Sequence, residues 1–129
     1  MVKKFEFQKN SLTLDIAGHT FDIELTAEVI AASDRIKEQA AQTAGELSHS
    51  GGSNEEAIKK ACVFLADGIN GILGEGAAET IFEGRKVNIL DLSDVLNFIL
   101  TSIYEKISEE TAKRYGKTAK RSGGRKAKK

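Results

Sequence analysis

The longest apolar pattern of the chain lies in its C-terminal third and predicts an amphipathic helix over about residues 89–112. Its apolar residues recur at three-and-four spacing, which places them on one side of an α-helix. They are Leu92, Val95, Leu96, Ile99, Ile103 and Ile107. Leu90, Phe98 and Leu100 make this stripe wider than one core-facing side requires. We therefore expect the helix to be covered by the rest of the domain, by a second copy or by a partner.

A period-two pattern near the start of the chain predicts a β-hairpin over residues 5–25. The alternating apolar residues are Leu12, Leu14 and Ile16, then Phe21, Ile23 and Leu25. Ala17-Gly18-His19 between the two runs is typical of a tight turn. Phe5 and Phe7 either extend the hairpin or form a short third strand. Because two strands alone are marginally stable in water, we expect their apolar face to pack on helices.

Three further helices are expected between the hairpin and the last helix, at about residues 27–47, 54–73 and 76–83. The first has a weakly apolar face that is largely alanine, so it should pack closely but bury little area. The second contains Gly68 and Gly71, which weaken a helix and often mark close packing against a neighbour. The chain is therefore predicted to have an α+β fold, with the hairpin packed on about four helices.

Short polar residues mark the expected ends of these helices. Thr26 is expected to cap the first helix and Ser53 the second, where Glu56 completes a capping box. Gly84 should end the short helix in a left-handed conformation, and Asn88 should cap the last helix.

A formal net charge of zero hides a strong asymmetry along the chain. Residues 1–112 form the predicted domain and hold ten cations against all 19 acids, a net charge of −9. Residues 113–129 form a predicted disordered tail with nine cations and no acid. These cations are Lys113, Arg114, Lys117, Lys120, Arg121, Arg125, Lys126, Lys128 and Lys129.

No group of residues predicts a catalytic, cofactor or metal site. His19 and His49 lack neighbouring ligands, and Cys62 falls on an apolar helix face, as a structural cysteine would. Gly74-Glu75-Gly76 follows no strand and lacks the further residues of a phosphate-binding loop. We therefore expect a protein that is not an enzyme.

Composition favours a protein of the cytoplasm. The chain has 40% hydrophobic and 29% charged residues, which is ordinary for a soluble domain. Its single cysteine leaves no disulfide framework, and its first residues, Met1-Val2-Lys3-Lys4, do not have the pattern of a signal peptide. No apolar run approaches the roughly 18 residues that span a membrane.

Two segments carry a resemblance to a known family. They are FEFQKNSLTLDIAGHTFDIEL near the start and ILGEGAAETIFEGRKVNILDLSDVLNFI before the basic end, with helices between them. In this order the chain resembles small tail assembly chaperones encoded by long-tailed bacteriophages and prophages of Gram-positive hosts. The resemblance covers most of the chain and is most specific over residues 73–99.

The resemblance implies a non-enzymatic helper of virion assembly that acts in the host cytoplasm and is absent from the mature virion. Chaperones of this family are thought to coat the helical tape measure protein and to help recruit tail tube subunits. The expected partners are therefore the tape measure protein, the major tail tube protein and further copies of the same chain.

We expect partners or further copies to be bound by burial of apolar side chains on the last two helices. The candidate residues are Ile81, Phe82, Leu92, Val95, Leu96, Phe98, Ile99 and Ile103, and core packing is the competing role for at least half of them. Two alternatives stay open. One is a nucleic-acid-binding accessory protein that acts through the basic tail, although Tyr115 is the only aromatic residue there. The other is a structural tail-completion or connector protein.

Overall fold

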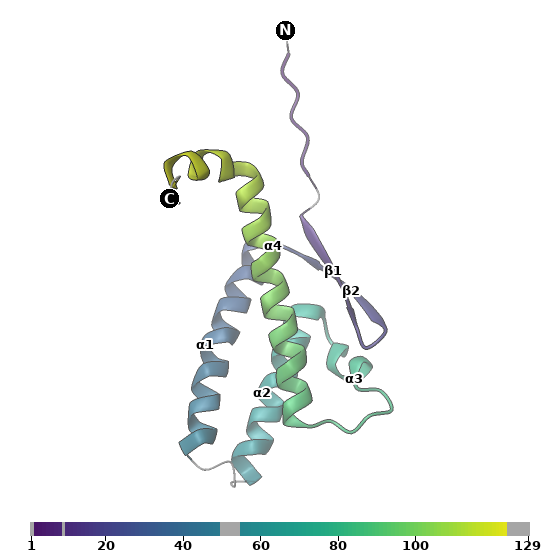
Figure 1. The fold of residues 1–129 in the computed structure, drawn as a ribbon. Helices are drawn as coiled ribbons and strands as arrows, with labels where there is room; N and C mark the ends of the chain where they lie inside the picture. Colours follow the sequence, from purple (N-terminus) through teal and green to yellow (C-terminus); the bar gives the residue numbers. More distant parts are fainter. Residues whose placement is uncertain (1, 9, 50–54, 124–129) are drawn as a thin grey trace.

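A computed structural model describes the backbone of residues 2–8, 10–49 and 55–123, and the side chains of these residues except 47–49 and 116–123. In this part of the chain a two-stranded antiparallel hairpin precedes four helices, so the predicted α+β fold is confirmed (Figure 1). The elements are β1 (Ser11–Ile16), β2 (His19–Glu24), α1 (Ala27–His49), α2 (Glu55–Leu73), α3 (Ala77–Ile81) and α4 (Ile89–Gly123).

The hairpin closes with a two-residue turn. Ile16 pairs with His19, so His19 begins β2 instead of lying in the turn. Ala17 and Gly18 connect the strands with φ values of +55° and +87°. Two successive positive φ values match the twist of paired strands, as in a type I′ turn.

Residues 2–8 form an N-terminal arm that belongs to neither strand. The arm leads into β1 from outside the body of the protein, away from the tip of the hairpin (Figure 1). The predicted hairpin is therefore confirmed over residues 11–24 only. Phe5 and Phe7, expected in an extended or third strand, are exposed on the arm.

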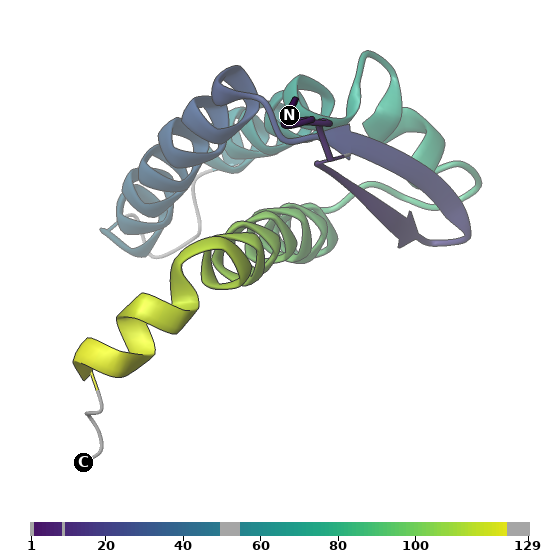
Figure 2. The same ribbon diagram turned by 90° about the horizontal axis from the view of Figure 1, so that it is seen from above.

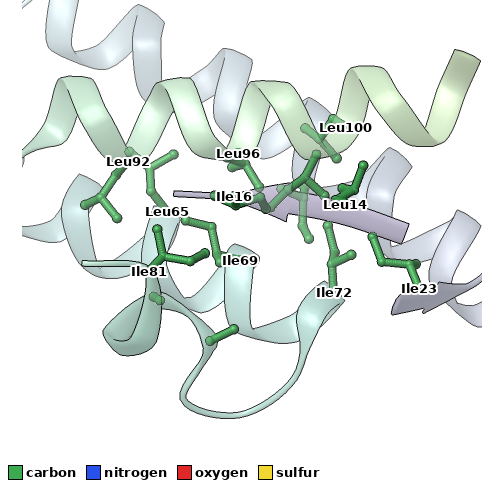
Figure 3. Packing of buried hydrophobic residues seen from close by; sticks show 14 of the residues in the cluster. Leu14, Ile16, Ile23, Leu65, Ile69, Ile72, Ile81, Leu92, Leu96 and Leu100 are labelled. Carbon is green, nitrogen blue, oxygen red and sulfur yellow. The ribbon is translucent and has the colours of Figure 1, made fainter. Parts of the chain in front are cut away.

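One apolar core joins the hairpin, α2, α3 and α4 and includes Ile36 of α1 (Figure 3). The long helix α4 packs mainly on α2, and the hairpin lies over both of them. Each fully buried aliphatic side chain contributes about 1.5–3 kcal/mol relative to an exposed one. The core residues on the strands are Leu14, Ile16 and Ile23, those on α2 are Leu65, Ile69 and Ile72, and those on α4 are Leu92, Leu96, Ile99, Leu100 and Ile103.

Gly68 allows α2 to lie close to both α1 and α4. A Cβ at this position would lie 3.4 Å from Cγ2 of Ile36 and 3.7 Å from Cδ1 of Leu96. The prediction of close packing is therefore confirmed for Gly68. It is wrong for Gly71, where a Cβ would meet nothing within 4 Å.

Polar side chains cap α1 and α4 as predicted. The N–H of Val29 donates to Oγ1 of Thr26 at 3.2 Å, and the N–H of Asp91 donates to Oδ1 of Asn88 at 2.9 Å. Gly84 has the expected left-handed conformation, with φ +76°. The predicted cap of α2, Ser53, lies outside the described residues.

The end of α4 differs from the prediction. The helix continues to Gly123, beyond the end that the sequence placed near Ala112. Loss of the apolar pattern does not end a helix whose surface charges pair at helical spacing. Lys113 lies 3.6 Å from the Glu109 carboxylate and 3.3 Å from that of Glu110. The last turns of α4, yellow in Figures 1 and 2, turn away from the axis of the earlier turns.

The hairpin turn offers a test of its backbone strain. Ala17 is a non-glycine residue in the left-handed region, where asparagine is better tolerated. Ala17→Asn is therefore expected to raise the free energy of unfolding by about 0.5–1 kcal/mol, measured by denaturant titration. Gly18→Ala is the opposing control and should lower it by about 1 kcal/mol. A stabilising Gly18→Ala would contradict this description of the turn.

Candidate functional site

The structure buries six of the eight residues predicted to bind a partner. Ile81, Phe82, Leu92, Leu96, Ile99 and Ile103 all lie in the core. Val95 is half-buried against that core. Of these eight residues only Phe98 is exposed, with an exposed fraction of 45%. Most of the predicted stripe therefore packs within the domain itself in this conformation.

Exposed apolar side chains remain around the start of α4. Leu90 is 73% exposed and Val87, in the preceding loop, is 59% exposed. Leu90 lies one helical turn before Ser93 and Asp94, so these three residues share one flank of α4. Phe98 lies one turn beyond Asp94. Of the wide apolar stripe in the sequence, only single residues such as Leu90 and Phe98 are therefore exposed on the surface.

An open groove of about 480 Å³ runs between α1, α2 and α4, beside this flank. Its walls carry small or apolar side chains with a few polar groups among them. From α1 they are Lys37, Ala40, Ala41, Thr43 and Ala44; from α2, Ala61 and Leu65; and from α4, Ile89, Ser93, Asp94, Leu96, Asn97 and Leu100.

The groove results from the size of the α1 side chains. Alanines at positions 40, 41 and 44 extend too little to fill the space between α1 and α4. Helix α1 packs more extensively on α2 than on α4, and Figure 1 shows α1 and α4 apart along the second half of α1. The alanine-rich face of α1 therefore buries little area against α4 and leaves the groove open to solvent.

Polar contacts fix α1 to α4 at one end of the groove. The Tyr104 hydroxyl of α4 donates a hydrogen bond to the Asp34 carboxylate of α1. The Lys37 ammonium lies 4.6 Å from the centre of the Tyr104 ring, within cation–π range. The hydrogen bond to Asp34 raises the pKa of Tyr104, because removing the proton would place two negative charges side by side. These contacts hold the spacing of the two helices.

The His and Cys residues that the sequence singled out lie apart in the described part of the chain. Among the described residues, no cluster of three or more His, Cys, Asp or Glu side chains is placed to hold a metal ion. Cys62 is half-buried against the core and His19 lies in β2. The side chain of His49 lies outside those described. Within the same part of the chain, every helix is too short or too polar to cross a membrane.

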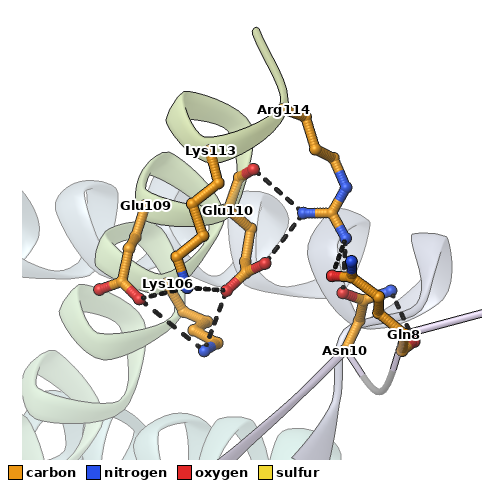
Figure 4. A network of polar contacts seen from close by, with 7 residues as sticks. All are labelled: Gln8, Asn10, Lys106, Glu109, Glu110, Lys113 and Arg114. Carbon is orange, nitrogen blue, oxygen red and sulfur yellow. Dashed lines mark hydrogen bonds and ion pairs between the residues drawn. The ribbon is translucent and has the colours of Figure 1, made fainter. Parts of the chain in front are cut away.

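The first cations of the predicted basic tail are engaged within the domain (Figure 4). The Glu110 carboxylate lies 2.9 Å from the Arg114 guanidinium, 3.2 Å from the Lys106 ammonium and 3.3 Å from that of Lys113. The Arg114 guanidinium also donates to Oδ1 of Asn10 at 3.1 Å and to Oε1 of Gln8 at 3.4 Å. Arg114 therefore connects the end of α4 to the base of the N-terminal arm.

The other tail cations lie beyond the described side chains. Lys117, Lys120 and Arg121 belong to the last turns of α4, but the positions of their side chains are not described. Arg125, Lys126, Lys128 and Lys129 lie outside the described residues. Their predicted electrostatic role stays a prediction.

Sequence reasoning missed the groove because its walls come from three separate helices. The one signal was the run of alanines on the predicted face of α1. That run predicted close packing, and the structure shows close approach only near Ile36 and Gly68. Further along α1, at Ala41 and Ala44, the same small residues face the groove.

The ion pairs around Glu110 predict a pH dependence. Hydrogen bonds from Arg114 and Lys106 hold the pKa of the Glu110 carboxyl at about 2, below its ordinary value of 4.5. A carboxyl with a lowered pKa in the folded protein stabilises it above the ordinary value, and this stabilisation is lost as the pH falls toward the folded pKa. Glu110→Gln should therefore lower the melting temperature at neutral pH, by a difference that narrows between about pH 4.5 and pH 2.

Glu109→Gln is the matched control for this experiment. Glu109 is more exposed than Glu110, and its ion pairs are longer, at 3.6 and 4.0 Å. Its substitution should change the melting temperature less at neutral pH. A Glu110→Gln difference that stays constant across the acid range would contradict the assignment.

Comparison with known proteins gives a family. No curated protein and no solved structure matches the chain. Residues 11–129 match a sequence model described as a family of unknown function, DUF6673. The match begins at β1 and takes in the hairpin and all the helices described above. The chain therefore belongs to the DUF6673 family of unknown function.

Proposed function

We propose that the protein is a non-enzymatic tail assembly chaperone that binds helical segments of a phage tape measure protein. The groove between α1, α2 and α4 is the observation that carries the proposal. It is an open and largely apolar site between helices, which is the kind of surface that takes an amphipathic helix. The resemblance of residues 73–99 to such chaperones also supports it, because this segment includes most of the α4 wall of the groove.

The side chains of the groove fit a helical client. Alanines on α1 allow the client backbone to approach, while Leu65, Leu96 and Leu100 supply an apolar floor. Each leucine-sized client side chain buried there would contribute about 1.5–3 kcal/mol. Exposed Leu90 extends the apolar surface beyond the groove along the same flank of α4.

We expect the polar groups of the groove to determine the direction in which a client helix binds more than its affinity. Lys37 lies on α1 beside Tyr104, and Asp94 lies on α4 ten residues before Tyr104, toward the other end of the groove. Opposite charges toward the two ends of the groove favour one direction of a client helix, because a helix carries a positive N-terminal end and a negative C-terminal end. A long, repetitive client could be covered by many copies that bind in the same direction.

The remaining parts of the proposal follow from the resemblance. The chaperone would act in the host cytoplasm, would help to recruit the major tail tube protein, and would be absent from the mature virion. Self-association of the chain belongs to the same expectation. The nucleic-acid alternative is less favoured, since Lys113 and Arg114 are paired with carboxylates of the domain.

Co-expression with the tape measure protein tests the proposal. The wild-type chain should raise the soluble fraction of the tape measure protein. Ala41→Lys with Ala44→Lys should remove most of this effect, because both positions are exposed and line the groove. Loss of one buried leucine-sized contact corresponds to about tenfold or more in affinity.

Ala31→Lys is the matched control, since Ala31 is an exposed alanine of α1 that does not line the groove. It should leave the rescue unchanged, and circular dichroism should give the same helix content for all variants. A tape measure protein that is no more soluble with the wild-type chain would contradict the proposal. So would salt-sensitive DNA binding that is lost on truncation after Ala112, which would favour the nucleic-acid alternative.

A further inference from the structure

The most exposed aromatic side chains of the described residues lie on the N-terminal arm. Phe5 is 77% exposed and Phe7 is 91% exposed. Their rings pack edge to face with centroids 4.9 Å apart, so both lie on one side of the arm. Lys4 and Glu6 alternate with them and form an ion pair of 3.0 Å. This is the period-two pattern of a strand with one apolar and one polar face.

The arm is held away from its own hairpin. Asn10 and Gln8, at its base, accept hydrogen bonds from Arg114 at the far end of α4. From this point the arm runs outward (Figures 1 and 4). The fixed base keeps the arm from folding back along β1 of the same chain.

The hairpin offers a free edge to such a strand. The N–H of Leu25 donates to the carbonyl of Asn10 at 2.9 Å. Because bonded positions alternate along an antiparallel pair, the backbone groups of Ser11, Thr13 and Asp15 point away from β2. No backbone hydrogen bond within the described residues joins this edge of β1 to another element.

The edge of β2 is less available, because the outward carbonyl of Glu24 already accepts the N–H of Thr26 at 2.9 Å. An unpaired edge on a sheet of only two strands favours addition of another strand. The edge of β1 is therefore the better site for it.

The charges of the two surfaces are complementary. The exposed face of the hairpin carries Asp15, Asp22 and Glu24, and residues 11–25 contain no Lys or Arg. The arm carries Lys3 and Lys4 against one acid, Glu6. If Phe5 and Phe7 join the apolar face of the sheet, Lys4 and its ion-pair partner Glu6 lie on the acidic face. The arm as a whole keeps one net positive charge against the three acids of the hairpin.

We propose that the N-terminal arm adds as a third strand to the free edge of β1 in a second copy of the chain. Backbone hydrogen bonds give the pairing, and burial of Phe5 and Phe7 stabilises it. If two copies exchange their arms, each arm pairs with the β1 edge of the other copy, as in a twofold-symmetric dimer. The proposal does not depend on which client the groove binds. The arm precedes residues 11–129, which match the family, so the proposal is made for this chain and not for the family as a whole.

Light scattering after size exclusion, over a wide range of concentration, tests the proposal on the full chain. The wild type should self-associate, and a variant without residues 2–8 should stay monomeric. Phe5→Ser with Phe7→Ser should raise the dissociation constant about tenfold or more. Val87→Ser with Leu90→Ser removes two exposed apolar side chains elsewhere, and it should leave the dissociation constant unchanged.

A second pair of variants tests the edge of β1. Thr13→Pro removes an outward N–H that the hairpin itself does not use, and should abolish association. Thr13→Val keeps that N–H and loses only the side-chain hydrogen bond to Asp22, so it should still associate. Hydrogen exchange at Thr13 and Asp15 should slow as the protein concentration rises.

The proposal is overturned if the wild type is monomeric at all concentrations, or if its assembly persists without the arm. Exchange at Thr13 and Asp15 that is independent of concentration would also overturn it. The arm deletion leaves every core residue in place, so the result does not rely on Thr13→Pro folding correctly.

Discussion

The packing of α4 on α2 is the interaction on which the rest of the structure depends. Leu92, Leu96 and Ile99 of α4 meet the buried side of α2 at Leu65 and Ile69, and the hairpin is stable only because this surface receives it. The same packing explains why an unusually apolar helix presents few apolar residues to solvent. Its stripe is used within the domain. What it leaves for a partner is one flank, at Leu90, and the isolated Phe98.

A second constraint follows from the first. Because α2 and the hairpin cover most of the apolar stripe, α1 needs to add little to the core, and alanines are sufficient along much of its face. Gly68 brings α1 close at Ile36, and the Tyr104–Asp34 hydrogen bond holds it there. Further along α1 the residues that line the space are Ala40, Ala41, Thr43 and Ala44, and the groove opens there. The groove is thus what remains when a small-residue helix is fixed near one end only.

The sequence predicted the parts of this fold that depend on local chemistry. Period-two alternation predicted the hairpin, and three-and-four spacing predicted the helices in order. Thr26 and Asn88 predicted the starts of two helices. Each of these signals lies within a few residues of the element that it predicts. The end of α4 and the groove were not predictable in this way. Periodicity places Leu92 and Phe98 on sides of a helix but does not say which side meets the core. Which side of the helix meets the core depends on elements that are distant in the sequence. The groove also depends on such elements, because its walls come from three helices.

The groove and the N-terminal arm lie toward opposite ends of the molecule (Figure 1). The groove is bordered by the second half of α1 and the first turns of α4, from Ile89 onward. The arm leaves the domain at the other end of α4, where Arg114 joins Asn10 and Gln8. Figure 1 shows this separation along the length of α4. Copies joined through their arms would therefore keep their grooves open. A long helical client needs such an arrangement, because association between copies must not compete with binding.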